Sequence, residues 1–276
     1  MFKYGGFFTY KAFLEGYSGQ DYMGVGQFVF LAIATLAIIL VSIFLRKASH
    51  KKIDVLLKIL AVVIPFLDLL KIVIESYFDI KGGSGFNFSG LMPLYTCSIF
   101  VYSLPIAAFG KGKAREYSLA FITTLGIFAG LTNFVMAPIL NTYPFFNFHT
   151  FVSLNLHFWM VFVGIYLIAS GYYVPRWVDI FKGMVPLTIL SVVVIPVDYA
   201  LSAYYGWSVD YMLYHSGLGA PLLPDIANAL AARGLRPIFT MMIFVMYIVI
   251  SAIIVSIVRL VCFLRGKGGR APFDAR

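Results

Sequence analysis

The sequence is poor in charged residues and in cysteine. Only 12% of its 276 residues are Asp, Glu, Lys or Arg, about half the share usual in soluble domains, whereas 61% are hydrophobic. This composition excludes a soluble globular enzyme, a disordered chain and a nucleic-acid-binding module, so we expect no nucleic acid as a partner. The two cysteines, Cys97 and Cys262, lie in different apolar segments, which indicates no disulfide framework.

Signatures of cofactor and metal binding are also missing. The chain has no P-loop, no dinucleotide-binding fingerprint and no serine-hydrolase elbow. Its histidines do not stand at metal-ligand spacing from one another or from a cysteine. We therefore expect neither a cofactor nor a metal site.

Long apolar runs, in contrast, are abundant. A membrane-spanning helix needs about 20 apolar residues, and seven segments approach that length. They are residues 27–45, 55–79, 90–110, 115–138, 150–173, 178–205 and 237–263. Because no long polar linker separates them, we predict an all-α, polytopic membrane protein with seven transmembrane helices, folded as a single domain over residues 1–276. The second segment is the weakest, since it carries three charged residues.

Basic residues indicate the orientation of this bundle. Of the 21 Lys and Arg residues, 15 fall in loops on one side of the predicted helices and five on the other. Since basic residues collect in cytoplasmic loops, the N-terminus is predicted outside and the C-terminus in the cytoplasm, where residues 264–276 form a basic tail.

Two predicted outer segments carry many aromatic residues. Residues 1–26 are typical of an interfacial helix or aromatic belt. Residues 206–236 form the longest loop, and loops of this length are often functional. The loop is either a lid over the outer end of the bundle or a solvated connector.

Polar groups on five predicted helices lie at a similar depth below the outer headgroups. Cys97 and His157 each lie seven residues into their segments, roughly 10 Å at the helical rise. Asp198 lies seven residues from the outer end of the sixth segment. The other polar groups at this depth are Glu75, Thr132 and Asn133. Because polar groups in membrane helices are costly, a shared depth favours a shared site.

These residue types suit acyl transfer at the level of a lipid ester bond. A thiol becomes a good nucleophile when a base helps to form the thiolate, and His157 is a candidate base for Cys97. Asp198 or Glu75 would orient the imidazole. Structural roles remain open: Cys97 as a small core residue, His157 as a buried hydrogen-bonded residue, and Asp198 as a partner for backbone groups freed by Pro196.

Three charged residues share one narrow arc of the second segment. Asp68, Lys71 and Glu75 are spaced so that the lysine reaches both carboxylates. We expect this face to point into the bundle, either as a structural ion network or as a contact for a substrate headgroup. On the fourth segment, Gly126 and Gly130 predict close helix packing.

The run Met92-Pro93-Leu94-Tyr95-Thr96-Cys97-Ser98 resembles the proline-leucine-x-x-cysteine signature of the YwaF-like bacterial membrane proteins. These are related to the transmembrane protein 164 acyltransferases and, more distantly, to the androgen-induced hydrolases of lipid esters. His157 matches the second hallmark of the family, and residues 210–214 are similar to its asparagine-tyrosine-methionine motif. Departures are Tyr95, where the family has histidine, and Asp210, where it has asparagine. The resemblance implies a seven-helix fold, a cysteine–histidine pair and, in the eukaryotic branch, acyl transfer between phospholipids.

The leading hypothesis is an integral membrane acyltransferase in the bacterial plasma membrane, with membrane phospholipids as partners. Cys97 would carry the acyl chain as a thioester, with His157 as base and Asp198 as its orienting partner. Residues expected to contact substrate are Glu75, Tyr95, Thr132, Asn133, Asp210 and Tyr211, of which Thr132, Asn133 or Tyr211 could donate to an oxyanion. A lipid ester hydrolase with the same pair and a proton-coupled small-solute transporter are the alternatives. The oligomeric state stays open.

Overall fold

The computed structural model describes residues 6–14, 16–81, 93–205, 211–213 and 223–264, and within these ranges every regular element is a helix. The α-helices are α1 (Val25–Leu45), α2 (His50–Lys81), α4 (Ser98–Phe109), α5 (Gly112–Thr123), α6 (Leu125–Met136), α7 (Phe148–Ala169), α8 (Trp177–Tyr205), α9 (Leu223–Ala231) and α10 (Arg236–Leu264). Short 3₁₀ helices, η1 (Lys11–Phe13) and η2 (Pro138–Asn141), accompany them. The predicted all-α class is confirmed for the described part of the chain.

Among the described residues, five helical segments are long and apolar enough to cross a membrane. They are Val25–Leu45, Gly112–Asn141, Phe148–Ala169, Trp177–Ala203 and Arg236–Leu264. A multi-pass membrane protein is therefore supported. Seven spans and the orientation of the bundle stay predictions.

The two remaining predicted spans lie in α2 and α4. Helix α2 covers 55–79 and is long enough to cross a membrane, but it carries too many charged side chains to count as an apolar span. Helix α4 has only 12 residues and covers the second half of the predicted span 90–110. Part of that span, residues 90–92, lies outside the described residues.

The predicted span 115–138 is divided between two helices. Thr124, with φ −122° and ψ −102°, separates α5 from α6. The hydroxyls of Thr123 and Thr124 donate to the carbonyls of Leu119 (2.8 Å) and Ala120 (2.6 Å). Such bonds compete with regular helix geometry. The two adjacent buried threonines therefore lie at a break in the helix, which a hydropathy pattern does not show.

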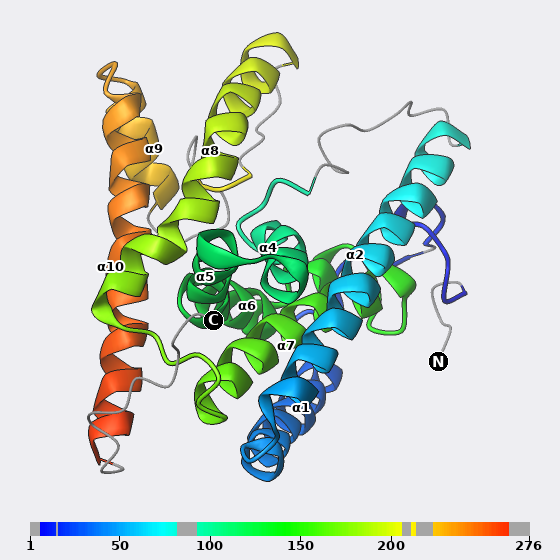
Figure 1. Cartoon of the computed structure of the whole chain (residues 1–276). Helices are drawn as coiled ribbons and strands as arrows, with labels where there is room; N and C mark the ends of the chain where they lie inside the picture. The colour runs from blue at the N-terminus through cyan, green and yellow to red at the C-terminus, as the bar shows by residue number, and fades with distance from the viewer. Residues whose placement is uncertain (1–5, 15, 82–92, 206–210, 214–222, 265–276) are drawn as a thin grey trace.

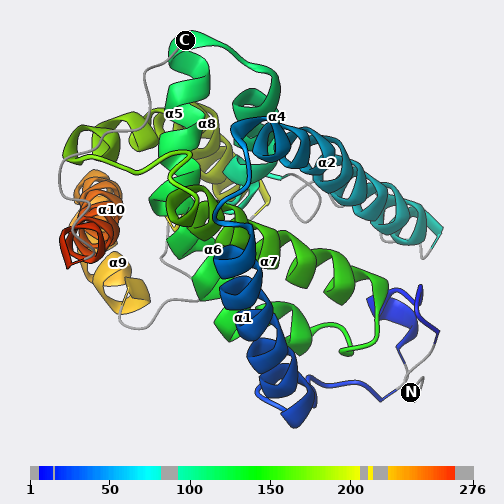
Figure 2. The same cartoon turned by 60° about the horizontal axis from the view of Figure 1, so that its bottom comes forward.

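Helices α4, α5, α6 and α7 form the centre of the molecule, with α1 and α2 on one flank and α8, α9 and α10 on the other (Figures 1 and 2). Helices α6 and α7 pack closely at Gly130. A Cβ atom added there would lie 2.7 Å from Cβ of Met160 and 3.2 Å from the carbonyl oxygen of His157. The close packing predicted from Gly130 is confirmed, and it supports the turn of α7 that carries His157.

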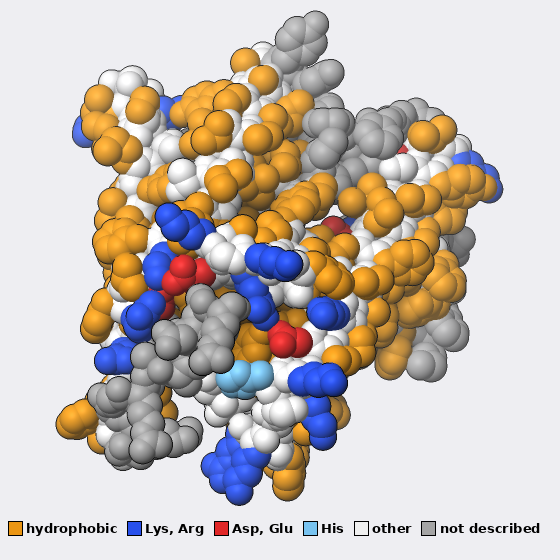
Figure 3. Space-filling view, in the orientation of Figure 1, with side chains coloured by type: hydrophobic (Ala, Val, Ile, Leu, Met, Phe, Trp, Pro, Cys, Tyr) orange, Lys and Arg blue, Asp and Glu red, His pale blue; other side chains and the backbone are white. Residues whose placement is uncertain are grey.

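Charged side chains join the predicted inner ends of four helices. Arg115 of α5 lies 2.7 Å from Asp54 of α2, and its guanidinium also donates to the hydroxyl of Tyr172, which follows α7. Basic side chains, with acidic ones among them, gather on the face shown in Figure 3. Since the predicted inner loops contribute these contacts, the structure brings those loops together.

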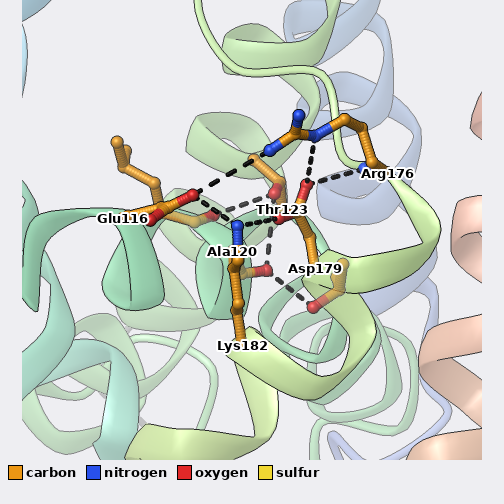
Figure 4. A network of polar contacts seen from close by, with 8 residues as sticks. Glu116, Ala120, Thr123, Arg176, Asp179 and Lys182 are labelled. Atoms are coloured by element: carbon orange, nitrogen blue, oxygen red, sulfur yellow. Dashed lines mark hydrogen bonds and ion pairs between the residues drawn. The ribbon is translucent and has the colours of Figure 1, made fainter. Parts of the chain in front are cut away.

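A second set of contacts lies beside the first and is drawn in Figure 4. Lys182 of α8 bonds Glu116 of α5 and lies 3.4 Å from Asp179, while the side chain of Arg176 lies 3.8 Å from Asp179. We call both sets together the inner-end network, which consists of Asp54, Arg115, Glu116, Tyr172, Arg176, Asp179 and Lys182.

The N-terminal segment lies against the start of α7. Its described residues before α1 contain one turn of 3₁₀ helix, η1, and no α-helix. The backbone of Phe148 donates to the carbonyl of Phe7 (2.8 Å), and the side chain of Asn147 donates to the carbonyl of Thr9 (2.8 Å). The segment is thus attached to the bundle largely through its backbone and its aromatic rings.

The long predicted outer loop, 206–236, contains a helix of its own. Helix α9 occupies its second part and packs against α10. Residues 211–213 are also described, whereas 206–210, 214–222 and the tail 265–276 lie outside the described residues, and with them Asp210.

Candidate functional site

Cys97 lies directly before α4, in the capping position of that helix. Its carbonyl accepts a hydrogen bond from the amide of Phe100 (3.0 Å), which starts the helical ladder, and its half-buried side chain packs against the main core. The first amides of a helix lack intrahelical partners and carry a partial positive charge. The thiol is therefore placed at the positive end of α4.

Lys71 of α2 lies near this thiol. It forms an ion pair with Asp68 (3.4 Å) but, among the described residues, none with Glu75, so the prediction that the lysine reaches both carboxylates holds for Asp68 alone. Lys71 also interacts electrostatically with Cys97. Helix α2 packs along α4, which explains the approach. A positive charge beside a thiol favours the thiolate, and the carboxylate of Asp68, which is paired with the same lysine, acts against it.

His157 lies in α7 and is 6% exposed. Its Nδ1 atom is 2.8 Å from the carbonyl oxygen of Ser153. Because a carbonyl oxygen only accepts, Nδ1 carries the proton and Nε2 holds a lone pair in the neutral ring. Within the described residues, the buried Nε2 atom has no hydrogen-bond partner. His157 has the tautomer that a general base needs.

The structure relates Cys97 to His157 through Lys71. The lysine interacts electrostatically with both side chains, and α2 packs against both α4 and α7. No hydrogen bond joins the thiol to the imidazole among the contacts of the described residues. Such bonds are often long before substrate is bound.

Asp198 and Glu75, the predicted orienting carboxylates, have other partners. Asp198 of α8 accepts from the backbone amide of Tyr211 (3.4 Å). Glu75 lies 3.1 Å from Nδ1 of His149. Neither carboxylate bonds His157 in the described structure, in which the carbonyl of Ser153 makes the orienting contact instead.

His149 belongs to a second buried group, which sequence analysis did not find. Its ring is fully buried and stacks on Tyr143 with ring centroids 4.4 Å apart. Nearby, Tyr10 donates to Asp79 at 2.5 Å. Burial and, after it, the bond to Asp79 raise the pKa of Tyr10 well above its usual value, so the phenol keeps its proton. We call Tyr10, Glu75, Asp79, Tyr143 and His149 the outer cluster.

The predicted oxyanion donors on α6 bond their own helix. The hydroxyl of Thr132 donates to the carbonyl of Phe128 (3.1 Å), and the amide of Asn133 donates to that of Ala129 (3.2 Å). Either group would have to leave these bonds to reach a substrate. Their substrate role stays a prediction.

Tyr95 and Tyr211 meet beside Cys97. Their rings make an edge contact with centroids 5.2 Å apart. Thr96, the residue between Tyr95 and Cys97, bonds the hydroxyl of Tyr247 in α10 at 3.0 Å. The contact between Thr96 and Tyr247 cannot be predicted from the sequence, because only the fold brings α10 to this turn.

No group of three or more His, Cys, Asp or Glu in the described ranges is arranged to hold a metal ion. The apolar helices define a multi-pass helical membrane protein. In it, helix α2, which carries Lys71, packs against both α4, which begins after Cys97, and α7, which carries His157.

The chain belongs to the TMEM164 family, which it matches over residues 22–264. This confirms the relationship to the transmembrane protein 164 proteins that the cysteine and histidine motifs indicated. No curated protein and no solved structure matches the chain.

Proposed function

We propose that this protein is an integral membrane acyltransferase that moves a fatty acyl chain between membrane phospholipids through a thioester on Cys97. The observation that carries the proposal is the state of His157. Its proton is held on Nδ1 by a backbone carbonyl, and its buried Nε2 atom is left without a partner among the described residues. Membership of the TMEM164 family supports the same chemistry.

In the first half-reaction the thiolate of Cys97 attacks the carbonyl carbon of a phospholipid ester. The new carbon–sulfur bond replaces the carbon–oxygen bond to the glycerol. His157, which took the thiol proton on Nε2, returns it to the departing alkoxide, so a lysolipid leaves.

In the second half-reaction a hydroxyl of an acceptor lipid attacks the thioester. It gives its proton to Nε2 of His157, a carbon–oxygen bond forms, and the thiolate leaves. Lys71 stabilises the negative sulfur at the start and the end of the cycle, a role supported by its electrostatic interaction with Cys97.

Water in place of the acceptor hydroxyl would make the same site a lipid ester hydrolase. A proton-coupled transporter is the alternative from another class, and the buried carboxylates Asp68 and Asp79 on α2 favour it. The two classes differ in one chemical consequence, since only the enzyme forms a covalent acyl adduct.

The test is the intact mass of the purified protein after incubation with phospholipid vesicles. We expect a hydroxylamine-labile acyl adduct on the wild type and on Cys262→Ser, the matched control for the other cysteine, and none on Cys97→Ala. His157→Gln should reduce adduct formation and lipid turnover by about 100-fold or more, the usual contribution of a general base. An adduct that persists in Cys97→Ala, or wild-type turnover in His157→Gln, would contradict the proposal.

A further inference from the structure

Two residues of the long predicted outer loop are buried within the helices, and the next one, Leu213, is half-buried. Tyr211 is 2% exposed and Met212 is fully buried, and both belong to the main core together with Tyr247 of α10. We call residues Tyr211–Leu213 the inserted segment, which is the short yellow stretch between α8 and α9 in Figure 1. Its backbone groups need partners, because buried amides and carbonyls are costly when left unpaired.

Side chains of two helices supply those partners. From α8, Asp198 accepts from the amide of Tyr211 (3.4 Å), and the hydroxyl of Ser191 contacts a side chain of the segment, lying 3.8 Å from the sulfur of Met212. From α10, the hydroxyl of Tyr247 donates to the carbonyl of Met212 (3.0 Å). The inserted segment is thus held between α8 and α10 by named side-chain contacts.

The same segment lies against the turn that carries Cys97. Because Tyr247 donates its proton to Met212, its oxygen accepts from the hydroxyl of Thr96, 3.0 Å away. The ring of Tyr211 meets that of Tyr95 in the same turn. One phenolic hydroxyl therefore links α10, the inserted segment and the residue before Cys97.

We propose that Tyr247 is a positioning residue that controls access to Cys97. Its hydroxyl holds the inserted segment against the turn 95–97 and so closes the loop side of the thiol to bulky molecules. A lipid then reaches Cys97 from between the helices. The proposal rests on the proposed function only in taking Cys97 as the reactive group, and it assigns the control of access to Tyr247, which is not among the residues expected to contact the substrate.

The test compares two maleimides, one small and one bulky and water-soluble, in the full chain carrying Cys262→Ser, in which Cys97 is the one remaining cysteine. The ratio of the bulky to the small labelling rate measures access, because a change in thiol ionisation alters both rates equally. We expect Tyr247→Phe to raise this ratio about threefold to tenfold, the change expected from one lost neutral hydrogen bond.

Two further variants make the test specific. Thr96→Val breaks the same link from its other end and should raise the ratio similarly, while the double variant should add little, since both act on one contact. Tyr166→Phe is the matched control: it removes a buried phenolic hydroxyl that bonds the carbonyl of Leu45, and it should leave the ratio unchanged.

An unchanged ratio in both Tyr247→Phe and Thr96→Val would overturn the proposal, as would an equal rise in Tyr166→Phe. Because labelling needs no acyl chemistry, the outcome separates the two proposals. A raised ratio in a protein that forms no acyl adduct would refute the thioester mechanism and leave the role of Tyr247 standing.

Discussion

The inner-end network and the surroundings of Cys97 differ in whether their polar side chains have partners. At the inner end, Asp54 is matched by Arg115, and Glu116 is matched by Lys182. Around Cys97, Lys71 has Asp68, but Nε2 of His157 has no partner in the described structure although the residue is almost fully buried. Buried polar groups are nearly always satisfied where they serve the fold.

This difference separates a structural role from a chemical one. A paired group stabilises the fold and is already occupied, whereas an unpaired buried nitrogen costs stability and stays available to a substrate. We therefore expect damage at the inner end to lower stability and damage at His157 to lower activity.

The largest loss of stability is expected for Arg115→Met. The change removes a charge-assisted bond to Asp54 and leaves the carbonyl of Ala107 without its donor. Loss of a partly buried pair of this kind should cost about 2–3 kcal/mol of unfolding free energy. Chemical unfolding in detergent micelles, followed by tryptophan fluorescence, measures it.

Lys47→Met is the control for this change, because Lys47 is exposed at the same end of the molecule and should alter stability by less than about 0.5 kcal/mol. If both variants lost the same unfolding free energy, the contacts of the inner-end network would not stabilise the fold in particular. Labelling of Cys97 should stay at the wild-type rate in both.

The helices can be predicted best from the sequence where one apolar run fills one helix. The predicted span 150–173 is observed as Phe148–Ala169, because nothing polar interrupts it except His157 and its neighbours. The span 115–138 could not be predicted as two helices, since the bonds made by Thr123 and Thr124 are local and leave no trace in hydropathy.

The residues of the candidate site could be predicted from the sequence, but most of the contacts between them could not. The spacing of Asp68 and Lys71 on one arc of α2 indicated their ion pair. The approach of Lys71 to Cys97 depends on how α2 packs on α4, and the pairing of Glu75 with His149 joins residues far apart in the sequence. Neither contact can be derived from a helical period.

A smaller loss of stability is expected for Gly130→Ala, at the support of the site. The added Cβ would lie 2.7 Å from Cβ of Met160, so α6 and α7 must move apart. We expect a cost of about 1–3 kcal/mol, as for other overpacked cores, together with slower adduct formation, because the same contact supports the turn of His157. Unfolding and intact-mass measurements check the two parts.

Gly26→Ala serves as the control for Gly130→Ala, since its added Cβ would meet nothing closer than 3.8 Å. Full activity in a destabilised Gly130→Ala protein would show that the close packing supports the fold but not the position of His157.

The smallest change in stability, and the most informative one, is expected for His157→Leu. The leucine removes a buried nitrogen that has no partner in the described structure, which favours the fold, and it also removes the bond from Nδ1 to the carbonyl of Ser153, which opposes it. The two effects largely cancel, so the unfolding free energy should change by less than about 1 kcal/mol while lipid turnover is lost. Asn155→Leu, two residues from His157, is the control. It removes a side-chain bond to the carbonyl four residues earlier, that of Phe151, and touches no buried unpaired atom. It should change neither stability nor turnover appreciably. If His157→Leu alone lowered the unfolding free energy by about 2 kcal/mol or more, the cost of leaving a buried polar group unsatisfied, His157 would have a structural role. The contrast between the two regions would then be lost.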